Sequence, residues 1–316
     1  MYSLGVLSIV GSWALGSGIW GDSDAVPSSQ LPAPSAQLPK IDRTPKLYIG
    51  GKQARPDSGY SRFVYSPGGK IVGEVGEGNR KDIRNAVEAA RAALGAWSAT
   101  TTYNRAQILY YVAENLAARA GDFAARLRQT SGAADAEREV QLAIDRLFTY
   151  AAYADKFEGA VHAPPLRGAA LALHEPIGVV GVACPIARPL LGFVSLVAPL
   201  ISMGNTVVAI PSEQHPLSAT DLYQVLDTSD VPAGVVNIVT GARDPLAQVL
   251  AEHDDVDALW YVGTPDGRKR VEAASIGNMK RTWTHLESDL ARDELWSDEA
   301  LREAVHIKNI WLLHAI

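Results

Sequence analysis

The stretch IGVVGVACPIARPLLGFVSLVAPLISMGNTVVAIPSE, residues 177–213, decides the fold of this chain. Its first eight residues form a continuous apolar run that predicts a buried strand, and TVVAIPS at 206–212 predicts a second strand. A helix is predicted between them, over about 189–203. Apolar strands joined by a helix of this length are typical of a parallel sheet that is covered on both faces.

The same alternation of strands and helices continues downstream. We predict helices at about 216–227, 244–253 and 265–276, with strands at 235–241 and 257–263. Because crossovers between parallel strands are right-handed, such a series winds helices onto both faces of the sheet. The sequence therefore predicts an α/β fold with a doubly wound parallel, Rossmann-like sheet.

Helices dominate the sequence before this sheet. Asn79 is a predicted N-cap, and apolar residues recur after it every three or four positions. A second helix is predicted over about 103–120, where Gly121 marks its end. A third helical stretch covers about 122–157 and is interrupted at Gly132.

Three shorter segments favour strands and turns. LYIGGK (47–52) and SPGGKIVGEV (66–75) each combine a glycine pair with strand-forming residues. The glycines of GEVGEG (73–78) open no strand-to-helix phosphate turn, so we interpret them as turn residues and not as a nucleotide loop. Residues 159–175 contain two adjacent prolines and an alternating ALALH, which predicts a β-excursion.

Composition excludes several classes of function. The chain has 316 residues, 47% of them hydrophobic, and a net charge of -6, which argues against a nucleic-acid or membrane surface as partner. Its seven histidines are scattered, so we expect no metal site. A single cysteine cannot form an internal disulfide, which favours a reducing, cytoplasmic location.

The N-terminal segment is interpreted separately. Residues 1–20 are uncharged and mildly apolar, as in a signal peptide, but the first basic residue is Lys40 and glycines interrupt the apolar run. Five prolines among Ser, Gln and Ala make 21–45 an extended linker. We therefore expect residues 1–45 to be an apolar segment and linker, and 46–285 to be the folded domain.

Beyond these local patterns, the chain resembles the NAD(P)-dependent aldehyde dehydrogenase superfamily from about Leu47 to about Thr284. The motifs that carry the resemblance are YAAYAD (150–155), EPIGVVGV (175–182), MGNTVVAIPSE (203–213), VPAGVVNIVTG (231–241) and YVGT (261–264). The resemblance implies the NAD-binding domain of this superfamily, with the oligomerisation strands at 159–175. It also implies oxidation of an aldehyde by cysteine attack, hydride transfer and hydrolysis of a thioester.

The side chains required for that chemistry are changed. Ala187 stands where the superfamily has the oxyanion-binding Asn, whose loss typically costs about 10²–10³ in rate. His285 stands at the position of the base Glu; it could act as a base near neutral pH, but we favour a structural histidine. No G-Q-x-C nucleophile segment occurs, and Cys184 at a strand end is interpreted as a buried structural thiol. We therefore assign no catalytic residue.

Cofactor binding is predicted to be weak. The resemblance assigns a ribose-binding Lys and Glu to this domain, but here Ile210 replaces the Lys and only Glu213 remains. Gly263 and Thr264 match the Gly-Ser that opens the helix beneath the pyrophosphate. Glu213 would repel a 2′-phosphate, so NAD is favoured over NADP as a possible, vestigial cofactor.

The C-terminal segment, 286–316, is predicted to be a charged amphipathic helix followed by an apolar tail, with no catalytic domain. This pattern resembles the truncated, non-catalytic C-terminal domain of the sixteenth aldehyde dehydrogenase family. The leading hypothesis is a pseudoenzyme domain that associates with a complete aldehyde dehydrogenase or with itself, through apolar surface left exposed. An active NAD-dependent aldehyde oxidoreductase and a weak NAD-binding module remain the alternatives.

Overall fold

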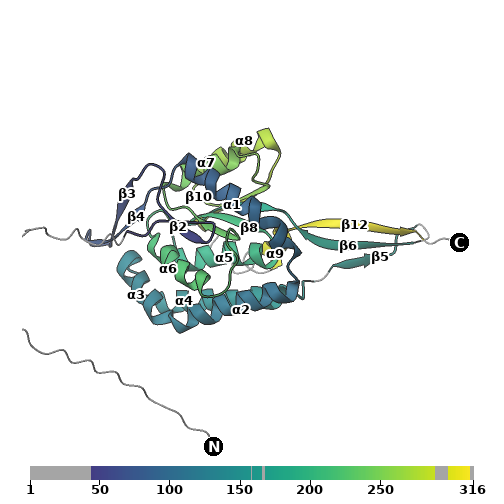
Figure 1. Ribbon diagram of the computed structural model, residues 1–316, viewed down its shortest axis with the longest axis horizontal. Helices are drawn as coiled ribbons and strands as arrows, with labels where there is room; N and C mark the ends of the chain where they lie inside the picture. The colour runs from purple at the N-terminus through teal and green to yellow at the C-terminus, as the bar shows by residue number, and fades with distance from the viewer. Residues whose placement is uncertain (1–43, 158, 166–167, 289–297, 314–316) are drawn as a thin grey trace, which may run out of the picture. The chain divides into compact units, whose positions relative to one another are not determined.

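A computed structural model describes residues 44–157, 159–165, 168–288 and 298–313 (Figure 1). They belong to one compact unit, Arg43–Ile316. The strands of these described residues form a seven-stranded, a three-stranded and a two-stranded sheet. The proposed segment and linker over 1–45 lie outside the described residues, apart from the last two positions.

The seven-stranded sheet has the order β11-β10-β7-β8-β9-β1-β2. Its strands are β1 (Leu47–Ile49), β2 (Lys52–Ala54), β7 (Val179–Ala183), β8 (Thr206–Ile210), β9 (Val236–Ile238), β10 (Ala258–Gly263) and β11 (Arg281–Leu286). The five strands from β11 to β9 are mutually parallel, whereas β1 and β2 are antiparallel additions at the β9 edge. Chain order reverses between β7 and β10, which confirms the predicted doubly wound sheet.

Helices cover both faces of this sheet (Figure 1). They are α1 (Arg80–Ala99), α2 (Thr102–Ala118), α3 (Ala120–Ser131), α4 (Ala136–Tyr153), α5 (Pro189–Ser202), α6 (Leu217–Asp227), α7 (Arg243–Glu252), α8 (Pro265–Ser275) and α9 (Asp298–Glu303). Neighbouring residues of β1, β7, β8 and β10 belong to two different buried clusters, because side chains alternate across a strand. The cluster on one face is completed by α1, α7 and α8. The cluster on the other face is completed by the buried sides of α2 to α6 and α9.

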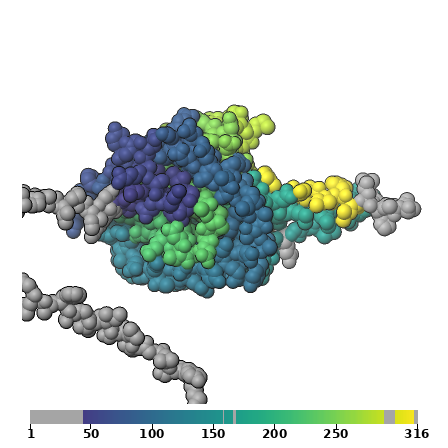
Figure 2. Space-filling model, viewed as in Figure 1, coloured from purple at the N-terminus to yellow at the C-terminus, as the bar shows by residue number. Residues whose placement is uncertain are grey.

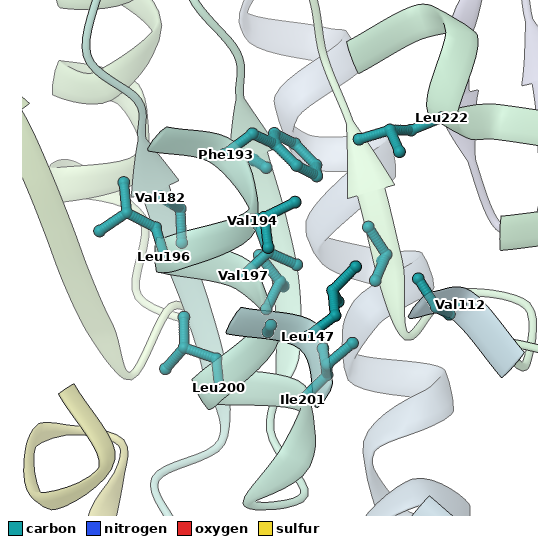
Figure 3. Close-up of a cluster of buried hydrophobic side chains, with 14 of the residues drawn as sticks. Val112, Leu147, Val182, Phe193, Val194, Leu196, Val197, Leu200, Ile201 and Leu222 are labelled. Carbon is teal, nitrogen blue, oxygen red and sulfur yellow. The ribbon is translucent and has the colours of Figure 1, made fainter. Parts of the chain in front are cut away.

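Helix α5 lies at the centre of the larger cluster. All fourteen of its residues are buried, because it packs on the sheet with one side and on neighbouring helices with the other. Figure 3 shows Phe193, Val197 and Ile201 of this helix close to Leu147 of α4 and Leu222 of α6. The helix predicted over about 189–203 is confirmed, and because it is apolar all round it is an interior helix.

Local sequence signals explain several element ends. Asn79 caps α1, because its Oδ1 accepts from the backbone N–H groups of Lys81 and Asp82, and the Asp82 carboxylate accepts from the Asn79 N–H at 2.9 Å. Gly132 has φ 69° and ends α3, as expected from its sequence. The second helix was expected to end at Gly121, but α2 ends two residues earlier, with Arg119 as its C-cap. Gly121 therefore belongs to the first turn of α3.

Asn205, in the GNTVV motif, fixes the amino end of the sheet. Its Oδ1 accepts from the Gly178 N–H at 3.0 Å, just before β7. Its Nδ2 donates to the carbonyl oxygens of Leu200, at 3.0 Å, and Ala304, at 2.8 Å. One fully buried amide therefore joins β7, β8, α5 and the segment after α9.

The three-stranded sheet corrects the prediction for the C-terminal segment. It contains β5 (Ala160–His162), β6 (Gly168–Pro176) and β12 (Val305–Leu313), in the order β12-β6-β5. The β-excursion is confirmed; of the helix expected after Leu286, the described residues contain the six of α9, and 289–297 lie outside the described residues. β12 pairs along its whole length with β6, so distant pairing and not local pattern determines its conformation.

A small antiparallel pair, β3 (Ser61–Tyr65) and β4 (Ile71–Gly76), completes the fold. Val64 and Val75 of this pair pack on Leu217 at the start of α6. The outer face of the pair carries Phe63 and Tyr65, each about half exposed at 52%. The glycine-rich segment therefore forms a strand and turns, and it contributes no nucleotide loop.

Candidate functional site

The candidate site lies at the carboxyl ends of the parallel strands. In open α/β sheets, ligands bind in the crevice outside these ends, at the point where the strand order reverses. Here that point lies between β7 and β10. The loops after β7, β8, β9, β10 and β11 meet at this edge, and the site residues predicted from the sequence lie in these loops or in the last residues of the strands before them.

Arg243, at the start of α7, is the central side chain of this edge. Its guanidinium side chain is only 4% exposed. Nη1 donates to Glu287 Oε1 at 2.7 Å and to the Val262 carbonyl oxygen at 3.3 Å. Nε donates to Asp244 at 3.2 Å, and the guanidinium carbon lies 5.5 Å from the centre of the Tyr261 ring. The arginine is therefore enclosed by acceptors and by an aromatic face.

The charges of this cluster are mutually stabilised. Burial by itself lowers the pKa of Arg243, but its interactions with Glu287, Tyr261 and Asp244 outweigh burial and hold the pKa above its ordinary value. Burial raises the pKa of Asp244, but hydrogen bonds from Tyr261 and Arg243 hold that pKa below its usual range. Arg270 also pairs with Asp244, at 2.7 Å. The guanidinium and this carboxylate therefore stay ionised at neutral pH.

Glu287 connects two loops of the edge. Its Oε1 accepts from Arg243 and also from the backbone N–H of Ile186, at 3.2 Å. Ile186 lies in the Pro185-Ile186-Ala187 loop after β7, and its carbonyl oxygen accepts from Ser212 Oγ at 3.1 Å. The loop that resembles an oxyanion-binding loop is thus held in place by protein groups on both sides.

The three predicted cofactor residues lie at this edge, each with a protein partner. Glu213 accepts from the backbone N–H of Arg243 at 3.0 Å. Thr264 caps α8 by accepting from the Gly267 N–H at 3.1 Å, and its own N–H donates to Tyr261 Oη at 3.3 Å. Gly263 is buried, and a Cβ built on it would lie 2.9 Å from the guanidinium carbon of Arg243.

This arrangement does not fit a dinucleotide. The Thr264 N–H that would face a pyrophosphate donates to Tyr261, and the Glu213 carboxylate that would hold a ribose accepts from Arg243. The side chains of Tyr261 and Arg243 together fill the space beside Gly263, where a cofactor would approach the backbone. We therefore derive no chemical step through NAD in this chain.

The residues at the predicted catalytic positions do not form a reactive set. Ala187 is exposed, whereas Ile210 is fully buried. His285 is half-buried in β11 and packs edge-on against Trp283, with ring centres 4.5 Å apart. Cys184 is fully buried, and burial raises the pKa of its thiol far above its ordinary value, although Arg243 opposes this shift. The prediction of a structural thiol is consistent with this environment.

Other kinds of site were sought in the described residues. No group of three or more His, Cys, Asp or Glu side chains is placed to hold a metal ion in that part of the chain. Within the same residues, none of the helices has both the length and the apolar character needed to cross a membrane.

Sequence reasoning missed the central pair of this site. Arg243 lies in TGARDP, which is typical of a polar loop, and Glu287 lies in a charged segment that matches no motif of the family. A signal was nonetheless present, because the carboxyl ends of parallel strands meet at one edge of a sheet. Opposite charges directly after the third and the last strand were therefore candidates for an ion pair.

Fold and site together define an α/β domain of the dinucleotide-binding type with an altered ligand edge. Residues 56–289 match the model of the aldehyde dehydrogenase family, and the chain belongs to that family. The 2-hydroxymuconic semialdehyde dehydrogenase of Pseudomonas putida is 37% identical over 247 residues, which are 73% of this chain and 50% of that enzyme. Human retinal dehydrogenase 2 is 34% identical over 267 residues, 81% of this chain and 51% of that protein.

Solved structures show the same fold. An NAD-dependent aldehyde dehydrogenase from Sinorhizobium meliloti has a TM-score of 0.73 and 31% identity, over 76% of this chain and 49% of that one. A betaine aldehyde dehydrogenase from Staphylococcus aureus, solved in complex with NAD+, has a TM-score of 0.74 at 23% identity, over 77% and 50%. The chain spans about half the length of the curated relatives it matches.

Proposed function

We propose that this chain is a non-catalytic domain of the aldehyde dehydrogenase family that acts by association, with a second copy or with a complete enzyme of the family. The observation that carries the proposal is the apolar three-stranded arm formed by β5, β6 and β12. Figure 1 shows no helix over the outer part of this arm, and Figure 2 shows it as a thin layer beside the body of the unit.

Apolar side chains gather on one face of the arm. Leu171 is paired with both Val161 of β5 and Ile310 of β12, so these three residues share a face. Leu173 and Leu312 lie two residues from members of this set and therefore point to the same side. Val161, Leu173 and Leu312 are 73%, 42% and 51% exposed. Such a continuous apolar surface on a described sheet is typical of an interface.

The departures from the enzyme motifs support a non-catalytic role. The family's reaction needs a thiolate nucleophile, an oxyanion donor and a base for the deacylating water. The one cysteine of the sequence is buried, Ala187 has no donor side chain, and His285 packs on Trp283. This combination resembles the truncated second domain of the sixteenth aldehyde dehydrogenase family. A cytoplasmic location suits a chain whose single thiol is free and buried.

Association is tested by charge placed on the arm. We expect the purified chain to sediment as a dimer or larger species, and the L173E/L312E variant to sediment as a monomer because two carboxylates would enter an apolar contact. F63E is the matched control, since Phe63 is equally exposed but lies on the β3–β4 pair. A wild-type chain that stays monomeric, and binds no complete aldehyde dehydrogenase when mixed with it, contradicts the proposal.

The second candidate is an NAD-dependent oxidoreductase acting on aldehydes, and the family membership of residues 56–289 favours it. Formation of NADH from NAD+ in the presence of aldehydes, followed by absorbance, would establish it if the activity survives further purification. A third candidate is a weak NAD-binding module using Glu213, Gly263 and Thr264. Calorimetry with NAD+ tests that candidate independently of catalysis.

A further inference from the structure

We propose that Arg243 and Glu287 close the dinucleotide crevice of this chain, with the arginine side chain in the place that a cofactor would take. The proposal goes beyond association through the arm and does not depend on it. It concerns a cluster of five residues at the carboxyl edge of the sheet, here called the edge cluster: Glu213, Arg243, Asp244, Tyr261 and Glu287.

The edge cluster joins four loops of the crevice and the end of β10. Glu287, after β11, binds the Ile186 N–H after β7 and the Arg243 guanidinium after β9. Glu213, after β8, binds the Arg243 N–H, and the Val262 carbonyl oxygen of β10 accepts from the guanidinium. In a cofactor-binding protein the ligand itself bridges such loops. In this chain two side chains connect the same loops without a ligand.

The charge of the edge cluster disfavours an anionic ligand. Asp244 and Glu287 pair with the buried guanidinium, and the Glu213 carboxylate accepts from the Arg243 backbone N–H; Asp244 also pairs with a second cation, Arg270. A pyrophosphate entering this edge would meet a net negative group of charges. It could bind Arg243 only after displacing Glu287, which would leave that carboxylate without its cation.

Steric exclusion acts in the same direction. A ligand that reaches the backbone at Gly263 must displace both the Tyr261 hydroxyl and the Arg243 guanidinium, whose carbon lies 2.9 Å from the position of a Cβ there. Moving the arginine would break its bonds to Glu287, Asp244 and Val262 at once. Because a paired buried ion is costly to separate from its partner, the closed arrangement is the stable one.

The test opens the crevice by removing both members of the pair. In the R243G/E287G variant the arginine and one carboxylate are gone, so a dinucleotide can enter the space of the guanidinium and needs to displace only the neutral Tyr261 hydroxyl from Gly263 and the Thr264 N–H. NAD+ binding is measured by calorimetry and by the shift of the melting temperature, with ADP-ribose as a second probe that lacks the nicotinamide. Circular dichroism of each variant verifies the fold.

We expect no heat and no shift for the wild-type chain at about 1 mM NAD+, and binding at least about tenfold tighter than this limit for the double variant. R243G alone should bind little, because Glu213, Asp244 and Glu287 then face the crevice without their cation. R270A is the matched control: it removes an exposed arginine that pairs with Asp244 but leaves the crevice closed, so it should also show no binding.

Two results would overturn the proposal. One is wild-type binding of NAD+ with a dissociation constant below about 100 µM. The other is a folded double variant that binds no better than the wild-type chain. If the double variant does not fold, R243A/E287Q replaces it: loss of the guanidinium and of the carboxylate charge must then allow binding that the wild-type chain lacks. None of these results bears on sedimentation through the arm, so the two proposals fail separately.

Discussion

The two ends of the parallel sheet differ in what their polar side chains bind. At the amino end, Asn205 bonds only to backbone groups, of Gly178, Leu200 and Ala304. At the carboxyl end, Arg243 and Glu287 bond mainly to each other and to neighbouring loops. The amino end has a structural role that is independent of any ligand. In open α/β sheets the ligand binds at the carboxyl end. In this chain the side chains at that end bind to one another and to the loops, in the place of a ligand.

This difference predicts that the carboxyl end no longer accepts a polar residue at position 210. Ile210 is fully buried in the cluster that contains Tyr261, over whose ring Arg243 lies. Ile210→Lys would place an ammonium group in this apolar cluster, next to an existing cation, and should lower the free energy of unfolding by about 4 kcal/mol. Urea-induced unfolding measures the change.

Ile210→Val serves as the control for Ile210→Lys, because it removes one methylene and should cost only about 1 kcal/mol. If Ile210→Lys is as stable as Ile210→Val, the crevice must be open enough for the lysine to reach solvent. That outcome would argue against a closed carboxyl end.

The amino end should be sensitive to loss of an amide instead. Asn205→Ala removes the side-chain partner of the buried Gly178 N–H and Ala304 carbonyl oxygen, while the Leu200 carbonyl oxygen keeps its bond from the backbone N–H of residue 205; the change should lower the free energy of unfolding by about 3 kcal/mol. Urea-induced unfolding is again the measurement. Asn309→Ala, at an exposed position of β12, should stay within about 0.5 kcal/mol of wild type. If both variants lower the free energy of unfolding equally, Asn205 does not stabilise the amino end in the way proposed.

The features at the amino end could be predicted from the sequence, whereas the central pair at the carboxyl end could not. The motif around Asn205, the capping residue Asn79 and the apolar strands were readable locally, because backbone-shaping residues act on their own neighbourhood. The strand Val305–Leu313 was not, because its partner β6 lies more than a hundred residues earlier. The Arg243–Glu287 pair likewise depends on strand order, and spacing along the chain does not reveal it.

Cys184, just after β7, tests whether the carboxyl end opens to solvent. Its backbone continues the strand pairing by donating to the Ile210 carbonyl oxygen at 2.9 Å, and its thiol is fully buried with a raised pKa. We expect alkylation by iodoacetamide near pH 8 to be at least about a thousandfold slower in the native chain than in urea, because only opened molecules react. Mass spectrometry follows the modification, and fast native labelling would identify an accessible thiolate.

The smallest effect is expected at Ala187, on the loop held by Glu287. This residue is exposed, so Ala187→Asn adds the missing amide without entering the core and should change the free energy of unfolding by no more than about 0.5 kcal/mol. It should also produce no aldehyde-dependent NADH, because an oxyanion donor stabilises charge only after a nucleophile has attacked. Thermal unfolding and NADH absorbance measure the two quantities. Activity in this variant would mean that the chain contains a nucleophile, and that the missing amide at position 187 alone had prevented catalysis.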